Sequence, residues 1–419
     1  MTFYKETEFQ DSTIGKTPKA WNVAKVSSIG DVFTGKTPST SNKNFWNGNI
    51  PFITPADINK TKYVYRTERH VTLSGAEQSR ILPKNTVLIV CIGSTIGKIA
   101  LTDKDSVTNQ QINSIICNKD SVEPEFVYYS ILFRSSLLKS FSGIAAVPIV
   151  KKSLFEQFKV PIPPVSEQKA IIQVLGIVDS AIELADTVIA KTERLKKGLM
   201  QQLLTRGIGH TEYKETKLGK IPRDWLVKRI GDVCKVVTGG TPSTQHPEYF
   251  GGNVKWLKSG DIKKLYMYDT EEKITQLGIE KSNAKIHPAC SVAIALSGRG
   301  QTRGRTTVLK EPMACSQSVA IMILNSELKP EYLHYNLSNR YMEIRNLTGN
   351  LDRSGLNLSI VSDIQIPVPS IAEQEEIALV LITVDKRIEL EKEEKMRLGH
   401  IRQGLMDLLL NGKIRIKVD

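Results

Sequence analysis

The sequence predicts an α+β protein with two mixed α/β lobes separated by two long antiparallel, coiled-coil-like helices, arranged as an internal pseudo-twofold repeat. Three observations predict this fold. Motifs near the start of the chain recur 204 residues later, and motifs that end the first copy recur at an offset of 206. Each copy also passes from short β-rich runs into a long stretch with a heptad-like apolar period.

The repeat is clearest in its turn motifs. Residues 34–40 read Thr-Gly-Lys-Thr-Pro-Ser-Thr, and residues 238–244 read Thr-Gly-Gly-Thr-Pro-Ser-Thr. Each copy ends in a proline block followed by Glu-Gln, at 161–168 and again at 367–374. The middles of the two copies match poorly. Two long units of this kind indicate a duplicated domain that shares a framework and differs in its centre.

Each lobe is expected to mix strands and helices. β-branched runs bounded by Pro, Asn or Gly predict buried strands at 86–90, 112–117, 291–295 and 318–324. Helical patterns follow at 125–140 and 330–347. Prolines then end each lobe, and Ser166 and Ser370 are predicted to cap the long helices.

The apolar seam of each long helix alternates spacings of four and three residues. We expect its apolar members to pair the two helices, namely Ile171, Leu175, Val178 and Ile182 with Ile377, Leu381, Val384 and Ile388. The alternation slips after Thr192 and Leu398, which resembles a coiled-coil stutter and puts Leu195 and Ile401 in the seam.

A helix of this kind, about 38 residues, would span roughly 57 Å, which is too long to bury its seam against one lobe. The two helices are therefore predicted to pair as an antiparallel spacer, and two separate surface helices remain the alternative. Glu391 and Lys395 interrupt the second seam, and we expect them to pair with each other at i, i+4 or to face a partner.

Positive charge is the unusual bulk property, with a net charge of +13. Lys and Arg outnumber Asp and Glu by 20 to 13 in residues 1–165 and by 22 to 16 in residues 208–369. The long-helix segments are close to neutral or acidic. Two basic blocks favour a polyanionic partner, with nucleic acid as the first candidate and general solubility as the alternative.

The sequence lacks the patterns that are typical of several functional classes. The five cysteines are single, which indicates a cytosolic chain, and the six histidines show no metal-ligand spacing. No apolar run could cross a membrane, and the N-terminus lacks a signal-peptide pattern. Gly93–Lys98 is one residue short of a phosphate-binding loop, and Gly298–Gly304 is one residue too long for a dinucleotide fingerprint. The chain is therefore predicted to have no catalytic residues, no metal and no cofactor of its own.

Loops at matching places in the two copies carry the candidate DNA contacts, because glycine allows close approach while hydroxyl, amide and basic side chains supply donors. The candidates are Lys36, Ser94, Thr95, Lys98, Gln110, Gln111, Arg299, Gln301, Arg303, Arg305 and Gln317. We expect Arg299→Ala or Arg303→Ala to weaken DNA binding and leave folding intact. Thr37-Pro38 and Thr241-Pro242 are interpreted at least equally well as turn framework.

The repeated threonine–proline motif, the Cys91–Lys98 loop, the proline–Glu-Gln helix starts and the Gly-Leu-Met helix ends at 198–200 and 404–406 occur in one order, twice. This pattern resembles the specificity subunit of type I restriction-modification systems across essentially the whole chain. The resemblance implies lobes that are target recognition domains, each reading one half of an asymmetric, bipartite double-stranded DNA target. It implies helices that set the gap between the half-sites.

The resemblance further implies a cytoplasmic, non-catalytic subunit that docks two methyltransferase subunits and restriction subunits. S-adenosylmethionine is then expected on the methyltransferase. The expected divisions are a first recognition domain at 1–165, a central helix at 166–208, a second recognition domain at 209–369, a C-terminal helix at 370–412 and a tail at 413–419. Two alternatives stay open, namely a specificity protein of another restriction–methylation system and a self-contained nuclease or methyltransferase with an unrecognised site.

Overall fold

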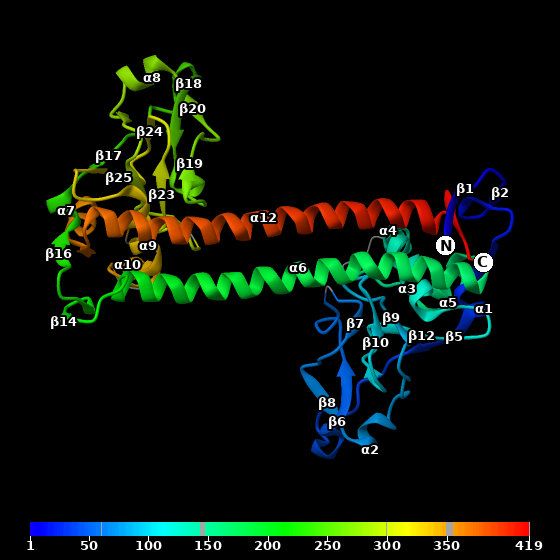
Figure 1. Ribbon diagram of the computed structural model, residues 1–419. Helices are drawn as coiled ribbons and strands as arrows, with labels where there is room; N and C mark the ends of the chain where they lie inside the picture. The colour runs from blue at the N-terminus through cyan, green and yellow to red at the C-terminus, as the bar shows by residue number, and fades with distance from the viewer. Residues whose placement is uncertain (60, 143–146, 299, 349–354, 419) are drawn as a thin grey trace. The chain divides into compact units, whose positions relative to one another are not determined.

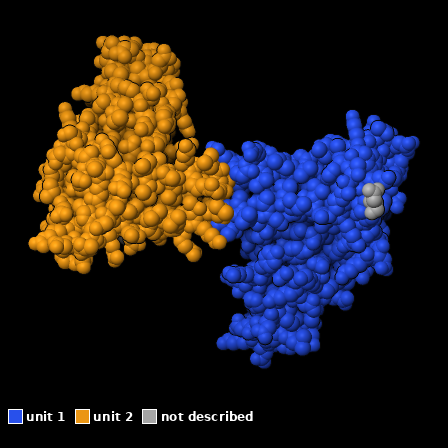
Figure 2. All heavy atoms as spheres, in the orientation of Figure 1, with its two compact units in different colours: residues 1–187, 392–419 blue, residues 188–391 orange. Residues whose placement is uncertain are grey.

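The computed structural model describes residues 1–59, 61–142, 147–298, 300–348 and 355–418. They form two compact units, residues 1–187 with 392–419 and residues 188–391 (Figure 2). Each unit holds one mixed α/β lobe together with part of each of two long helices. The units are described one at a time.

The two long helices are α6 (Val165–Arg206) and α12 (Ile371–Leu410), of 42 and 40 residues. The Ser370 hydroxyl accepts a hydrogen bond from the Glu373 backbone N–H at 3.3 Å, so the predicted cap of α12 is confirmed. The predicted cap of α6 is wrong. That helix begins at Val165, directly after the proline pair, and Ser166 lies exposed in its first turn.

The helices run antiparallel within each unit. In unit 1, Ile171 and Leu175 near the start of α6 share a buried cluster with Met406 and Leu409 at the end of α12. In unit 2, the end of α6 and the start of α12 share another cluster in the same way. Because the start of one helix packs with the end of the other in both units, the two chain directions are opposed, as predicted.

The predicted stutter is wrong, because the alternation of four and three continues through polar residues. Lys196 and Arg402 occupy the seam positions where the apolar pattern slipped, while Leu195 and Ile401 are 55% and 46% exposed. Lys196 Nζ lies 2.5 Å from Asp385 Oδ1, and Arg402 Nε lies 2.6 Å from an oxygen of Asp179. The seam is thus closed by ion pairs between the helices at these points.

Each of these aspartates also joins the helix pair to its lobe. The Tyr129 hydroxyl, from α3 (Pro124–Phe133), donates to Asp179 at 2.6 Å, and the Tyr335 hydroxyl, from α9 (Pro330–Asn339), donates to Asp385 at 2.7 Å. Burial, followed by the neighbouring carboxylate, raises the pKa of both tyrosines. Both hydroxyls therefore stay protonated as donors.

Glu391 and Lys395 do not form the predicted i, i+4 pair. Glu391 pairs with Arg387 one turn earlier on α12, and Lys395 of unit 1 pairs with Asp186 of α6. Each of the two residues is thus paired with a different partner.

The strands of the first lobe's two larger sheets are β5 (Gly30–Thr34), β6 (Trp46–Ile53), β7 (Tyr63–Val64), β8 (Arg69–Val71), β9 (Val87–Val90), β10 (Ile99–Thr102), β11 (Val107–Thr108) and β12 (Ile112–Cys117). One sheet has the order β5-β12-β9-β10-β7 and the other β11-β6-β8. Short helices complete the lobe, namely α1 (Val26–Ile29), α2 (Leu73–Ala76), α4 (Ser135–Ser140) and α5 (Lys152–Glu156).

The second lobe repeats this topology. Its strands are β17 (Cys234–Thr238), β18 (Phe250–Leu257), β19 (Tyr266–Met267), β20 (Lys273–Ile274), β21 (Ile286–His287), β22 (Val292–Ala295), β23 (Thr306–Leu309), β24 (Met313–Cys315) and β25 (Val319–Leu324). The sheet β17-β25-β22-β23-β19 corresponds to the first, and β20-β18-β24-β21 to the second. The short helices are α7 (Ile230–Val233), α8 (Gln276–Glu280), α10 (Tyr341–Arg345) and α11 (Leu358–Asp363).

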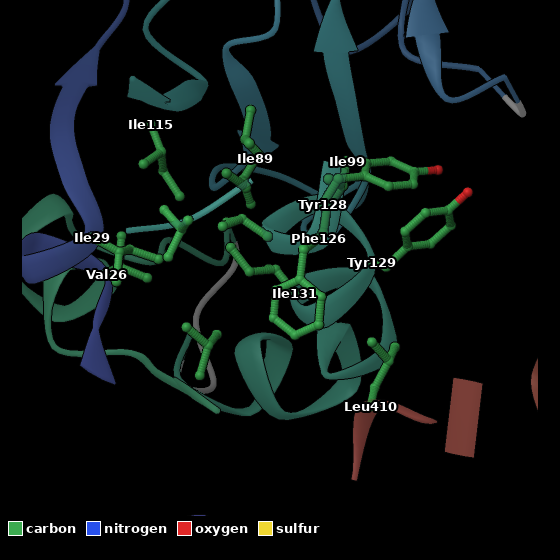
Figure 3. Packing of buried hydrophobic residues seen from close by; sticks show 14 of the residues in the cluster. Val26, Ile29, Ile89, Ile99, Ile115, Phe126, Tyr128, Tyr129, Ile131 and Leu410 are labelled. Atoms are coloured by element: carbon green, nitrogen blue, oxygen red, sulfur yellow. The ribbon is translucent and has the colours of Figure 1, made fainter. Parts of the chain in front are cut away.

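Apolar residues of α3 close the larger sheet of the first lobe. Figure 3 shows Phe126 and Ile131 of α3 beside Ile89, Ile99 and Ile115 of the strands. The smaller sheet lies at the end of the lobe that is remote from the long helix, with β6 and β8 in the first lobe and β18 and β20 in the second (Figure 1). The predicted strand at 112–117 is confirmed, and the other three each begin one residue later than expected.

The helix predicted at 125–140 is two helices, and so is the helix predicted at 330–347. The breaks fall at Arg134 and Arg340, which leave helical geometry. Arg134 is buried at its break and donates through its guanidinium to the Leu410 carbonyl, at the end of α12, at 3.0 Å. The break therefore satisfies one of the open carbonyls at that helix end.

Small two-stranded sheets frame each lobe. In unit 1 they pair β2 (Phe9–Ser12) with β3 (Gly15–Pro18), β4 (Asn22–Lys25) with β13 (Lys159–Ile162), and β1 (Thr2–Lys5) with β27 (Ile414–Lys417). In unit 2 they pair β14 (Tyr213–Thr216) with β15 (Gly219–Pro222) and β16 (Leu226–Arg229) with β26 (Gln365–Val368).

Glu167, Gln168 and Gln374 of the Glu-Gln motifs are buried, Glu373 is partly buried, and all four side chains accept or donate hydrogen bonds. Trp21 Nε1 donates to Glu167 at 3.0 Å, and Trp225 Nε1 donates to Glu373 at 2.9 Å. The Gln168 amide accepts from the Glu123 N–H at 2.8 Å and donates to two backbone carbonyls. Gln374 makes the same three bonds in the second copy. The motif therefore fastens each lobe to its long helix.

Replacing Gln168 by Met should lower the free energy of unfolding by about 2–4 kcal/mol, because one buried and two partly buried backbone groups lose their partner. Urea unfolding followed by circular dichroism measures the loss. The matched control is Gln173→Met, an exposed position on the same helix, which should stay close to wild type. Equal stabilities for the two variants would contradict this account of the motif.

The buried His334 of α9 should make unit 2 sensitive to acid. Burial, followed by the nearby Lys196 ammonium, lowers the pKa of His334 to about 4 from 6.5. As the pH falls, His334 is therefore protonated in the unfolded chain before it is protonated in the folded chain. The stability contributed by neutral His334 is present above pH 6.5 and is lost as the pH falls towards 4.

We expect the urea midpoint to fall more steeply between pH 6.5 and 4.5 in the wild type than in His334→Gln. His400→Gln, an exposed change, should keep the wild-type slope. A His334→Gln slope equal to that of the wild type would rule out this proton linkage.

Candidate nucleic-acid interface

A hairpin loop stands at the same place in each lobe, between β9 and β10 and between β22 and β23. The Gly97 N–H donates to the Val90 carbonyl at 3.0 Å, and the Gly304 N–H donates to the Ala295 carbonyl at 2.9 Å. Both glycines have positive φ, at 87° and 86°, which favours glycine at the loop closure. The predicted candidates at 94–98 and 301–305 therefore occupy equivalent loops.

A tight turn lies directly beside this loop and carries the candidate glutamines. In the first lobe the Ile112 N–H donates to the Asn109 carbonyl at 3.2 Å, and in the second the Val319 N–H donates to the Ser316 carbonyl at the same distance. Gln110 and Gln317 are thus the second residue of a β-turn in each lobe. The turn joins the hairpin loop through backbone bonds of 2.8 Å, from Cys91 and from its counterpart Leu296.

The threonine–proline loop completes the group by bonding to the turn. The Thr37 hydroxyl donates to Gln110 Oε1 at 2.7 Å, and the Thr241 hydroxyl donates to Gln317 Oε1. The preceding glycine allows the close approach: a Cβ on Gly35 would lie 2.2 Å from the Thr108 hydroxyl, and one on Gly239 would lie 1.8 Å from a backbone carbonyl oxygen. The glycine is framework, while the threonine side chain engages a candidate contact residue.

The candidates of the first lobe fall into two groups. Lys36, Ser94 and Gln110 are exposed, and Thr95 is half-buried. Lys98 Nζ instead donates to the Pro55 carbonyl at 3.2 Å, so this lysine also braces the turn that follows β6. The sixth candidate, Gln111, accepts a hydrogen bond from the Asn109 amide at 2.9 Å, which stiffens the turn that presents Gln110.

In the second lobe the structure separates the arginines. Gln301 is exposed and accepts from the Arg305 guanidinium at 3.2 Å, while its carbonyl accepts from the Tyr341 hydroxyl at 2.8 Å. Arg303 is only 5% exposed and belongs to the interior of the lobe. The expectation that Arg303→Ala leaves folding intact therefore has no support. Arg299 lies outside the described residues.

Two surface hollows mark regions that the sequence patterns missed. One, of about 580 Å³, lies on the first lobe and is lined by Thr40, Lys43, Trp46, Asn47, Gly48, Glu68, Arg69 and His70. The exposed Arg69 guanidinium lies 3.7 Å from the centre of the Trp46 ring, a geometry that holds the cation in place. The sequence feature that could have indicated this site is an aromatic residue opposite a basic strand, and it can be recognised only when the pairing of β6 with β8 is known.

The other hollow, of about 540 Å³, lies on the second lobe beside the candidate turn. Its lining includes Thr241 and Gln317 together with Trp256, Lys258 and Lys263. The lysines add positive charge, although Lys258 pairs with Glu272 and the lining also contains Asp261 and Glu271. Hydroxyl, amide and cationic groups beside an aromatic ring suit contact with a polyanion.

The two cysteines beside the candidate site are buried thiols. Cys91 and Cys315 adjoin the candidate site, but burial raises the pKa of each thiol to about 12, which keeps them from acting as thiolate nucleophiles. Over the described residues, no group of three or more His, Cys, Asp or Glu could hold a metal ion. Over the same residues, no helix is both long enough and apolar enough to span a bilayer.

Replacing Gly239 by Ala should cost about 1–3 kcal/mol, because the new methyl group overlaps the Cys315 carbonyl. Gly260→Ala, in the same lobe with open space around it, should change stability by less than about 0.5 kcal/mol. Thermal unfolding of both variants measures the difference. A Gly239→Ala variant as stable as the Gly260→Ala variant would show that the close approach is not required.

Comparison with known proteins follows the repeat seen in the structure. The family model described as "Type I restriction modification DNA specificity domain" matches twice, at residues 18–194 and 222–399. The MjaVIII specificity subunit of a type I restriction enzyme from Methanocaldococcus jannaschii is 27% identical, over 100% of this chain and 98% of the relative. The MjaIX specificity subunit from the same organism is 29% identical, over 99% of this chain and 98% of its own length.

Solved structures agree on the fold. The specificity subunit of a type I restriction-modification system from M. genitalium aligns with a TM-score of 0.60 at 15% identity, over 93% of this chain and 96% of that one. The paired family matches and the full-length relatives support the same assignment. This chain belongs to the type I restriction-modification DNA specificity family.

Proposed function

We propose that this chain is the sequence-reading subunit of a type I restriction-modification enzyme and recognises an asymmetric, two-part DNA target, with one half-site for each lobe. The observation that carries the proposal is the contrast within each lobe. The loop, turn and threonine–proline segment keep the same backbone arrangement in both copies, while the side chains on the hairpin loop differ.

The differing side chains support an asymmetric target. The first lobe offers Ser94 and Thr95 in its hairpin loop, and the second offers Gln301 and Arg305. Hydroxyl groups bond to several bases, whereas Arg prefers guanine and Gln prefers adenine in the major groove. Two lobes with one frame and different donors would select different half-sites. The excess of Lys and Arg in both lobes supplies the attraction to phosphate.

The long helices suit two copies of a partner subunit. Leu184 and Leu390 occupy equivalent positions and are 64% and 52% exposed, and the equivalent Leu195 and Ile401 are 55% and 46% exposed. A matched pair of exposed apolar positions, one on each copy, fits two methyltransferase subunits that dock in the same way. Restriction subunits would join this core. We further propose that the helix pair sets the gap between the half-sites.

Co-expression with the methyltransferase subunit tests the function. Purified complex, DNA and S-adenosylmethionine should give adenine methylation within one two-part sequence, mapped by sequencing of methylated bases. The chain alone, with magnesium and S-adenosylmethionine, should neither methylate nor cut DNA. Activity from the chain alone would establish the alternative, a self-contained nuclease or methyltransferase.

Arg69→Ala should weaken binding of the complex to its target about tenfold, because a cation that is held on the Trp46 ring and lines the first lobe's hollow is lost. Any change in sequence preference should stay within the half-site read by that lobe. Arg66→Ala removes an exposed arginine of the same lobe that does not line the hollow. If Arg66→Ala weakens binding as much, the effect reflects net charge and not this hollow.

A further inference from the structure

We propose that one threonine–glutamine pair in each lobe, Thr37 with Gln110 and Thr241 with Gln317, is a sequence-independent contact to the phosphodiester backbone of DNA. The inference rests on the proposed function and assigns a chemical group of the ligand to defined side chains. Recognition of base edges is then left to residues that differ between the lobes.

The turn that presents each glutamine is held without the pair. Its backbone is closed by the bond between its first and fourth residues. The residues on either side of the glutamine are also tied to each other, Asn109 to Gln111 at 2.9 Å and Ser316 to Ser318 at 2.7 Å. Both threonine–glutamine bonds are exposed to solvent. An exposed bond added to a turn that is already fixed contributes little to folding. Ligand binding therefore explains the presence of the pair in both lobes better than folding does.

The bond also decides what the glutamine can offer. A glutamine that reads adenine uses its amide oxygen as an acceptor and its amide nitrogen as a donor. In both lobes the threonine hydroxyl already donates to that oxygen, which occupies one of its two lone pairs and orients the amide N–H groups as the donors presented to a ligand. Donor groups match the oxygens of a phosphate, which are acceptors only.

A lysine accompanies the pair in each lobe, although it comes from a different position in the repeat. Lys36 directly precedes Thr37, where the second copy has Gly240. Lys258 lines the hollow together with Thr241 and Gln317, where the first copy has Thr54. Each lobe thus combines a hydroxyl, an amide and a lysine within one small region, and Lys258 also pairs with Glu272. This combination suits a phosphate.

The same pair in the same geometry argues against base reading. Two lobes that address different half-sites need different donors and acceptors at the positions that contact bases. A group that is identical in both lobes fits a part of DNA that is identical in both half-sites. The phosphodiester is that part.

The test uses the full chain in complex with its methyltransferase subunit. The wild-type complex first selects duplexes from a pool with randomised positions, and affinity for the selected duplex is then measured at several salt concentrations. We expect Gln317→Ala to bind about tenfold more weakly and Gln317→Glu more weakly still. Gln317→Lys should bind about as well as wild type, with the slope of log affinity against log salt steeper by about one. All three variants should select the wild-type sequence.

Thr241→Val and Thr241→Ser form a matched pair, because only serine retains the hydroxyl that orients the glutamine. Valine should weaken binding and serine should not, and the melting temperature of Gln317→Ala should equal that of the wild type. Relaxed preference at one base in Gln317→Ala would overturn the inference in favour of base reading, and unchanged affinity would overturn it in favour of framework. A wild-type complex that selects no sequence would overturn the proposed function itself, and the inference with it.

Discussion

A glutamate at the start of each long helix, buried in the first copy and partly buried in the second, is the constraint on which the rest of the structure depends. Glu167 is 3% exposed and receives the Trp21 indole N–H together with two donors of the Arg415 guanidinium, at 3.0 and 2.8 Å. A buried carboxylate without such partners would cost several kcal/mol, and breaking a buried pair costs about 3–5 kcal/mol. Lobe entry, helix start and chain end must therefore meet at this group.

In the second unit a different chain segment supplies the hydrogen-bond donors to the glutamate. Glu373 receives the Trp225 indole, the Ile208 backbone N–H at 3.0 Å and the His210 ring at 2.9 Å. The linker after α6 thus takes the place that the C-terminal strand takes in unit 1. In unit 1, Glu6 adds a second carboxylate to Arg415, and together the two acids raise the pKa of that guanidinium against the opposing effect of burial.

Much of this fold was predictable, because duplication tests each pattern twice. Turn motifs and proline blocks recur at offsets of 204 and 206, and buried strands recur between them, so a weak signal in one copy gains support from the other. The prediction of the seam was wrong after Thr192 for a physical reason. Apolar periodicity counts only apolar residues, while Lys196 and Arg402 keep the period through ion pairs with aspartates of the facing helix. A charged seam residue is recognisable only when its partner is known.

The candidate site was predictable where a residue's place follows from its local turn. Gln110 and Gln317 stand out in the sequence because a short polar run directly precedes a buried strand pattern in both copies. Trp46 and Arg69 could not be paired from sequence, since their contact depends on the register of β6 against β8, which a bulge shifts. Arg303 was misplaced for the opposite reason. A glycine-rich loop has no periodic face, so nothing in its pattern tells a buried position from an exposed one.

The distribution of matching and differing residues between the two copies follows from which side chains each copy needs for its fold and for its ligand. Groups that hold the lobe on its helix, such as Glu167, Gln168 and Asp179, are repeated because a change in one breaks a buried bond. Exposed groups on the hairpin loop, such as Ser94 and Gln301, are free to differ, because a change in them breaks no buried bond. The threonine–glutamine pair is an exposed feature that is nevertheless repeated. Folding alone does not demand it, so its repetition points to a constraint imposed from outside the chain, by a ligand feature common to both lobes.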